Sequence, residues 1–289
     1  MEQRSIGKVT VSAVGLGGMP LSIEGRPDQD QALATIHAAL DAGVTLIDTA
    51  DAYHRDATDV GHNETLIAKA LRQYEGDASE VLVATKSGHL RPGDGSWTLN
   101  GRPDYLKHAV KASAARLGVE AIGLHQFHRP DPSVPYEDSI GALAELLDEG
   151  VIQMAGVSNA NCDQIRLADK VLGGRLVSVQ NQFSPAFVSS YSELELCEDM
   201  GIAFLPWSPL GGIRNAARLG QKHEVFARIG RSHGASPQQV TIAWHLALSP
   251  VVIPIPGASR PQSIQDSAKA PELELSAGEI RELSAVLGR

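Results

Sequence analysis

Four ionisable side chains stand where short apolar runs of the sequence end: Asp48, Tyr53, Lys86 and His128. Runs of this kind, rich in valine, leucine and isoleucine, are typical of buried strands. A tyrosine keeps its proton at neutral pH because its ordinary pKa is about 10. A neighbouring lysine ammonium favours the phenolate and brings that pKa toward the working range. Tyr53 could therefore act as a general acid, with Lys86 lowering its pKa.

The other two residues complete this acid-base assembly. Asp48 could pair with Lys86 and keep it charged and aimed, while His128 could hydrogen-bond a substrate oxygen and orient it. Each residue taken alone also has a plain structural interpretation, as a helix cap, a solvated charge, a structural histidine or loop packing. The chemical interpretation depends on all four side chains meeting in one place.

Alternating strand and helix patterns predict how these residues are positioned. Apolar runs predict strands at residues 13–18, 44–48, 81–86, 122–128, 153–158, 177–182, 202–206 and 251–255. Apolar residues at helical spacing follow the strands, for example at 30–42 and 136–149. Residues 4–11 predict a β-hairpin that could plug the bottom of a barrel. An additional C-terminal helix is predicted to begin after a capping box at Ser276, and others after Ser190 and Ser236.

Eight strand-helix units without a linker predict an α/β fold, a (β/α)8 TIM barrel that forms a single domain over residues 1–289. The length of 289 residues is close to the roughly 250 of such barrels. A doubly wound sheet is the alternative, but residues 15–18 lack the third glycine of the dinucleotide fingerprint. In a barrel, the loops at the C-terminal strand ends form one ring. Asn159, Gln180 and Trp207 would then join the four ionisable residues.

The order and spacing of these residues resemble the aldo-keto reductase family. Four residues separate Asp48 from Tyr53, a Thr-Lys pair ends at Lys86, and His128 stands in Gln-Phe-His-Arg-Pro. The resemblance extends over nearly the whole chain. It implies that these four residues are the catalytic tetrad of an NADPH-dependent reductase of aldehydes or ketones, with Tyr53 as the proton donor.

The same resemblance implies a set of cofactor-binding residues. From the nicotinamide to the adenosine phosphate they are Ser158, Asn159, Gln180, Trp207, Ser208, Leu210, Gly257 and Arg260. The first three would hold the nicotinamide carboxamide, and Trp207 would stack on the ring in place of the usual tyrosine. Arg260 presents a fork of donors to a 2′-phosphate, which favours NADPH over NADH. Ser263 and Ser267 depart from the family pattern, which implies weaker binding of the adenine end of the cofactor than is usual in the family.

Three residues are candidates for the substrate pocket: Met19, His54 and Trp97. They stand in the loops after the first, second and third predicted strands. Trp97 ends a turn-rich segment, residues 91–97, that could fold over the mouth of the barrel. The expected substrate is a small carbonyl compound.

The composition excludes several classes of partner. With 34 acidic and 25 basic residues the net charge is −9, and no cluster of lysine and arginine offers a nucleic-acid surface. No apolar run approaches the roughly 20 residues of a membrane span, and the first residues have no apolar core long enough for a signal peptide, so we expect none. Cys162 and Cys197 have no metal-binding or redox spacing and fit a reducing cytoplasm. We expect a metal-free, cytoplasmic protein that is a monomer or a weak homo-oligomer.

Two alternative functions stay open at this point. A metal-dependent barrel hydrolase is suggested by Asp48, His54, His62, His125 and His128. However, residues three apart in one strand point to opposite faces, which disfavours a site with both His125 and His128. The other alternative is a redox-sensing module that binds NADPH and turns over slowly. The complete tetrad argues against it.

Overall fold

Parallel strands form the inner wall of the fold in the computed structural model, which describes residues 1–288. They are β3 (Leu16–Gly17), β4 (Leu46–Asp48), β5 (Leu82–Ser87), β8 (Leu124–Phe127), β9 (Ala155–Ser158), β10 (Leu176–Gln180) and β11 (Ala203–Phe204). Their order in the sheet follows their order in the chain, and every neighbouring pair is parallel. Their C-terminal ends therefore share one end of the sheet.

Residues 252–257 close this sheet into a barrel by lying between β11 and β3. Isolated parallel bridges make the closure on both sides. The eighth predicted strand is thus present as an extended segment but is not a regular strand. Pro254 and Pro256 explain the irregularity, because a proline has no N–H to donate to the ladder. Their carbonyls still accept hydrogen bonds from the N–H groups of Gly15 and Gly17, at 3.0 and 2.9 Å. The predicted (β/α)8 barrel is confirmed.

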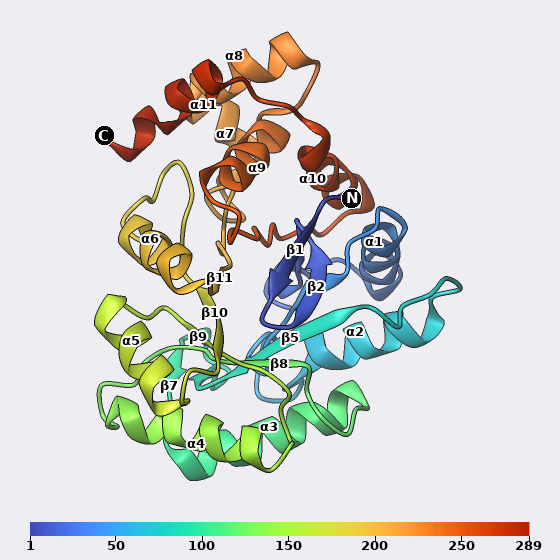
Figure 1. The fold of residues 1–289 in the computed structure, drawn as a ribbon. Helices are drawn as coiled ribbons and strands as arrows, with labels where there is room; N and C mark the ends of the chain where they lie inside the picture. Colours follow the sequence, from blue (N-terminus) through green and yellow to red (C-terminus); the bar gives the residue numbers. More distant parts are fainter. Residues whose placement is uncertain (289) are drawn as a thin grey trace.

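Helices cover the outside of the barrel (Figure 1). They are α1 (Gln29–Asp41), α2 (His62–Gln73), α3 (Pro103–Leu117), α4 (Tyr136–Asp148), α5 (Cys162–Val171), α6 (Tyr191–Met200), α7 (Leu219–Lys222), α8 (Glu224–His233), α9 (Pro237–Leu248), α10 (Pro261–Ala268) and α11 (Ala277–Leu283). Short 3-10 helices are η1 (Met19–Leu21), η2 (Ala216–Arg218), η3 (Ala270–Glu272) and η4 (Ser284–Leu287). None of the helices within residues 1–288 has the length and apolar character to cross a membrane.

The helix caps test the sequence reasoning in detail. Capping boxes are present at Ser236, before α9, and at Ser276, before α11, as predicted. The capping box predicted at Ser190, before α6, is wrong. Ser190 has φ −88° and ψ 20°, and its side chain makes no cap hydrogen bond. A serine cap needs extended backbone for its oxygen to reach the following N–H groups, and Ser190 lacks it.

A hairpin closes the bottom of the barrel, as predicted. Strands β1 (Gln3–Ile6) and β2 (Val9–Ser12) pair antiparallel through a turn with Gly7 at φ +56°. Ile6 and Val11 are fully buried and pack with inner side chains of β4, β5 and β8. In Figure 1 the hairpin lies across the strands near the N-terminus. The open end of the barrel is therefore the C-terminal end, where the tetrad stands.

The loop after β5 forms a second hairpin that the sequence did not predict. Strands β6 (His89–Leu90) and β7 (Thr98–Leu99) pair antiparallel within it. The hairpin places Trp97 against His89, with ring centroids 4.5 Å apart. Arg91 also packs on Trp97, with its guanidinium carbon over the indole ring at 4.7 Å from the ring centroid. The loop is thus an ordered wall beside the C-terminal strand ends.

Candidate active site

Lys86, on β5, is the centre of the site. Its side chain is fully buried, and its ammonium donates to Asp48 Oδ2 at 2.7 Å, to the Thr49 carbonyl at 2.7 Å and to Tyr53 Oη at 3.2 Å. Burial disfavours the charge, but the Asp48 carboxylate and the Tyr53 oxygen raise the pKa of Lys86 above its ordinary value. Lys86 therefore stays an ammonium, and its three donors hold Asp48 and Tyr53 in place.

Tyr53 lies between this ammonium and the cavity. Its hydroxyl oxygen accepts from Lys86, which leaves its own O–H free to donate into the cavity that it lines. Burial raises the pKa of Tyr53 above 10, and the positive charge of Lys86 offsets only part of this effect, while Asp48 adds to it. Lys86 acts to lower the pKa of Tyr53, as predicted, but burial outweighs it, so the predicted net shift toward the working range is not found. The sequence showed the cation but not the extent of burial.

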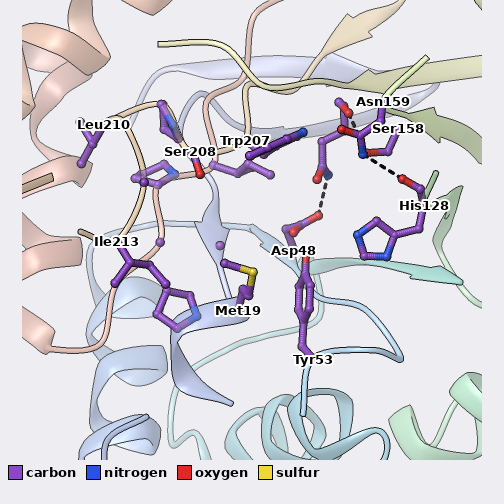
Figure 2. Close-up of a pocket in the computed structure, with 18 of the residues that line it drawn as sticks. Met19, Asp48, Tyr53, His128, Ser158, Asn159, Trp207, Ser208, Leu210 and Ile213 are labelled. Carbon is purple, nitrogen blue, oxygen red and sulfur yellow. Dashed lines mark hydrogen bonds between the residues drawn. The ribbon is translucent and has the colours of Figure 1, made fainter. Parts of the chain in front are cut away.

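His128 stands beside Tyr53, immediately after β8. The two rings are in edge-to-face contact, with centroids 5.8 Å apart (Figure 2). Burial, followed by the charge of Lys86, holds the pKa of His128 well below 6.5, so the imidazole is neutral. Its Nδ1 is buried and has no partner within the part of the chain that is described. A neutral imidazole can hydrogen-bond a substrate oxygen without competing for the proton of Tyr53.

A chain of buried amides fixes the other side of Asp48. Gln180, at the end of β10, donates from Nε2 to Asp48 Oδ1 at 2.7 Å and to Gln126 Oε1 at 2.9 Å. Gln126 in turn donates from Nε2 to Ser178 Oγ at 2.9 Å. Both hydrogens of the Gln180 amide are thus used inside the protein. Only its oxygen remains to accept a hydrogen bond from a ligand.

Ser158 and Asn159, at the end of β9, show the same pattern. The Asn159 amide donates to the His128 carbonyl and to Ser158 Oγ, each at 3.0 Å, and Ser158 Oγ donates to the Gln180 carbonyl at 2.7 Å. These bonds hold Asn159 in the left-handed region at φ +57°, which a non-glycine residue rarely adopts. The three cavity-facing side chains therefore present acceptors, not donors.

One cavity at the C-terminal ends of the strands gathers most of the predicted residues. It is lined by Met19, Asp48, Tyr53, Trp97, His128, Ser158, Asn159, Gln180, Trp207, Ser208, Leu210 and Gly257, among others. Lys86 lies directly behind this lining. Figure 2 shows that Tyr53, Asp48 and His128 lie toward one end, and that Leu210 and Ile213 lie toward the other. The cavity is thus elongated, with the acid-base residues at one end.

Besides Lys86, two predicted residues do not line the cavity. His54 is buried, at 3% exposure, and donates from Nδ1 to the Asp56 carbonyl at 2.7 Å, so its placement in the substrate pocket is wrong. Its carbonyl accepts from Arg91 at 2.5 Å, which fixes this loop from the other side. Arg260 is exposed at the N-cap of α10, beyond the cavity.

Two ionisable residues that line the cavity were missed by the sequence reasoning: His89 and Arg129. The rings of His89 and His128 are in edge-to-face contact, with centroids 5.0 Å apart. Burial and two nearby arginines lower the pKa of His89 to about 4, so it is neutral. Both residues follow strand ends closely, three residues after Lys86 and one after His128. The rule that identified the tetrad could have found them.

The geometry required by the hydrolase alternative is not found. Within residues 1–288, no three side chains of the His, Cys, Asp or Glu type lie where they could hold one metal ion. His125 is fully buried with Nε2 3.1 Å from Ser87 Oγ, while His128, past the end of the strand, faces the cavity. His125 is therefore in the buried interior and His128 at the cavity, so the two rings do not face a common site.

Comparison with known proteins agrees with this geometry. The model of the Aldo/keto reductase family matches residues 13–287. An uncharacterized oxidoreductase of Schizosaccharomyces pombe is 33% identical over 275 residues, which covers 94% of this chain and 85% of that protein. An aldo-keto reductase of the same yeast, named for NADP(+), is 28% identical over 97% of this chain and 89% of its own length. The solved glycerol dehydrogenase of Gluconobacter oxydans superimposes with a TM-score of 0.84 at 25% identity, over 99% of this chain and 95% of that one.

Proposed function

We propose that this chain, which belongs to the aldo/keto reductase family of NAD(P)H-dependent oxidoreductases, uses NADPH to reduce an aldehyde or ketone to the alcohol, with Tyr53 as the proton donor. The observation that carries the proposal is the position of the Tyr53 hydroxyl. It accepts from the buried Lys86 ammonium at 3.2 Å, faces the cavity and lies against the neutral ring of His128. A carbonyl oxygen in the cavity could accept from both Tyr53 and His128.

The cavity residues fit a nicotinamide cofactor. The hydrogen-bond donors of three side chains, Gln180, Asn159 and Ser158, are all used within the protein. Their oxygens are left as acceptors, which suit the N–H groups of a carboxamide. Trp207 offers an aromatic face, and its buried Nε1 has no partner in the described chain. When bound, the cofactor supplies the hydride from nicotinamide C4.

The proton step follows from the state of Tyr53. As the carbonyl carbon gains the hydride, the C=O π bond breaks and its electron pair moves to the oxygen, which takes the proton of Tyr53. The phenolate that remains is stabilised by the Lys86 ammonium, itself anchored on Asp48. Because burial raises the pKa of Tyr53, the hydroxyl keeps its proton at neutral pH and can donate it to the substrate oxygen. His128 orients the carbonyl.

The preference for NADPH is proposed from Arg260. Its guanidinium is exposed at the N-terminus of α10, where backbone N–H groups and the helix dipole also favour a phosphate. Gly257 lines the cavity and stands only three residues before Arg260, so the proposed phosphate site follows the cavity closely along the chain. The name of the yeast relative supports the same cofactor.

Turnover with both cofactors tests the function. We expect the protein to consume NADPH with a panel of small aldehydes and ketones, to yield the alcohols in equal amount, and to work less well with NADH. Arg260→Ala should weaken NADPH binding by about tenfold and leave NADH binding nearly unchanged, since one charge-assisted contact is lost. Absence of alcohol across the panel, with NADPH tightly bound, would instead favour a sensing module.

The cellular location, the size of the substrate and the oligomeric state are also part of the proposal. Both cysteines are free thiols, and Cys197 is buried, as suits a protein of the reducing cytoplasm. The substrate is a small molecule that fits the cavity, and a monomer suffices because one chain supplies every residue of the site. Size-exclusion chromatography with light scattering would contradict this if it gave a stable larger assembly.

A further inference from the structure

Arg129 brings an uncompensated positive charge to the wall of the cavity. It follows His128 directly, is half-buried and lines the cavity. Its Nη2 donates to Asn159 Oδ1 at 3.1 Å, while its Nε is buried and has no partner. Among residues 1–288, no aspartate or glutamate forms an ion pair with it. A half-buried guanidinium with an unused N–H needs an explanation.

This charge is costly in the free protein. Burial lowers the pKa of Arg129, although the side chain stays charged because an arginine keeps its proton in proteins. Removing a charge from water without a counter-charge is unfavourable. Arg91, which lies over the ring of Trp97, shows the usual solution, because it is paired with Glu24. Arg129 has no such partner and retains its charge for a ligand.

The cofactor does not account for this charge. A carboxamide oxygen could accept one hydrogen bond from Arg129, but it is neutral and cannot balance a guanidinium. The cofactor phosphates are expected along Ser208 and Leu210, which lie away from His128 in Figure 2. The nearest histidines, His89 and His128, are neutral and supply no negative charge. The anion must come with the substrate.

We propose that Arg129 is a substrate-binding residue and that the natural substrates are carbonyl compounds that carry a carboxylate. The inference rests on the proposed carbonyl reduction and names its substrate class. The reacting oxygen lies between Tyr53 and His128, and the carboxylate lies against Arg129, one residue further along the chain. A guanidinium suits a carboxylate because its planar fork matches the two oxygens. Trp97 and His89 form the adjoining wall.

A matched pair of substrates tests the proposal. 4-Carboxybenzaldehyde and its methyl ester have the same reacting group and similar shape, but only the acid carries a charge. With saturating NADPH, we expect the wild-type protein to favour the acid in kcat/KM. Arg129→Gln should lower the acid-to-ester ratio of kcat/KM at least tenfold. Arg129→Lys keeps the charge but not the planar fork, so its ratio should lie between those of the wild type and Arg129→Gln. Arg102→Gln removes an exposed arginine outside the cavity and should leave the ratio unchanged.

Other outcomes would overturn the proposal. If Arg129→Gln slows both substrates equally and weakens NADPH binding, Arg129 holds Asn159 or the cofactor and does not select the substrate. An unchanged ratio would reject the anion subsite outright. Calorimetric binding of terephthalate to the NADP+-saturated protein gives a readout without turnover. If no carbonyl is reduced but terephthalate binds, and binds tenfold more weakly to Arg129→Gln, the subsite stands while the proposed function fails. Absence of terephthalate binding to the wild type would count against the subsite.

Discussion

Gln180 and Lys86 hold the two oxygens of Asp48 from opposite sides, with Gln180 Nε2 2.7 Å from Oδ1 and Lys86 Nζ 2.7 Å from Oδ2. The carboxylate therefore has one orientation and cannot turn away from Lys86. Because Lys86 also donates to Tyr53, the amide chain behind Asp48 is linked through Lys86 to the proposed proton donor. We therefore expect residues that do not face the substrate to contribute to the reaction by fixing this geometry.

The amide chain can be tested at Gln126, which is not among the cavity-lining residues and whose side chain is hydrogen-bonded to Ser178 and Gln180. Gln126→Leu removes the acceptor that anchors one hydrogen of Gln180. We expect kcat to fall roughly threefold to tenfold, because Asp48 and Lys86 lose part of their fixed geometry. NADPH affinity should change less than kcat. A variant with reduced stability but unaltered kcat would show that the chain is structural only.

Tyr53→Phe removes only the hydroxyl that faces the cavity. We expect kcat to fall by about 100-fold or more, since general acids contribute roughly 10²–10⁴ to rate, while the dissociation constant for NADPH stays nearly unchanged. Tyr74→Phe is the matched control, because its exposed hydroxyl bonds Asp41 outside the cavity. Turnover by Tyr53→Phe at near wild-type rates would remove Tyr53 from the role of proton donor.

The pH profile of reduction follows from two shifted groups. Burial raises the pKa of Tyr53 above 10, so this residue keeps its proton and donates it across neutral and mildly alkaline pH. The pKa of His128 is well below 6.5, so protonation of its ring inhibits only in acid. We expect kcat at saturating substrates to be flat between about pH 7 and pH 9. A fall in kcat with an apparent pKa near neutrality would contradict these assignments.

A separate buried acid, Asp51, should make stability depend on pH. Burial, followed by the charge of Glu64, raises its pKa from 3.8 to about 8. Between these values the folded protein keeps a proton that the unfolded chain has lost. The resulting stabilisation is complete below pH 3.8 and is lost as pH rises to about 8, by at most about 1.4 kcal/mol per pH unit.

Asp51→Asn isolates this effect, because an amide resembles the protonated carboxyl and does not titrate. Measured by urea unfolding between pH 5 and pH 8, the variant should gain stability over the wild type as pH rises. The hydroxyl of Tyr105, which donates to Asp51 at 3.3 Å, could still bond the amide oxygen. Parallel stability curves for the two proteins would show that Asp51 is ionised in the folded state.

The sequence predicted those parts of the site that depend on strand ends. Apolar runs end at defined positions, and parallel strands bring their C-terminal ends together, so the meeting of Asp48, Lys86 and His128 could be predicted. Pro254 and Pro256 were also visible in the sequence and explain the irregular eighth strand. Because a proline cannot donate to the ladder, this irregularity could have been predicted from the sequence.

Other features depend on the packing of loops and were not readable. His54 turns away from the cavity because the Asp56 carbonyl and Arg91 hold its loop, and neither contact has a sequence signature. The shift in the pKa of Tyr53 depends on how deeply the hydroxyl is buried, which spacing does not reveal. The charge of Arg129 was visible, but its lack of an acidic partner required the structure.

Hydride transfer itself provides the most direct test of the account. NADPH that carries two deuterium atoms at nicotinamide C4 would be incubated with the protein and an aldehyde, and the alcohol analysed by mass spectrometry and NMR. We predict deuterium on the carbinol carbon, in an amount equal to the NADPH consumed. An alcohol without deuterium, or consumption of NADPH without any alcohol, would contradict carbonyl reduction at the site built from Tyr53, Lys86 and His128.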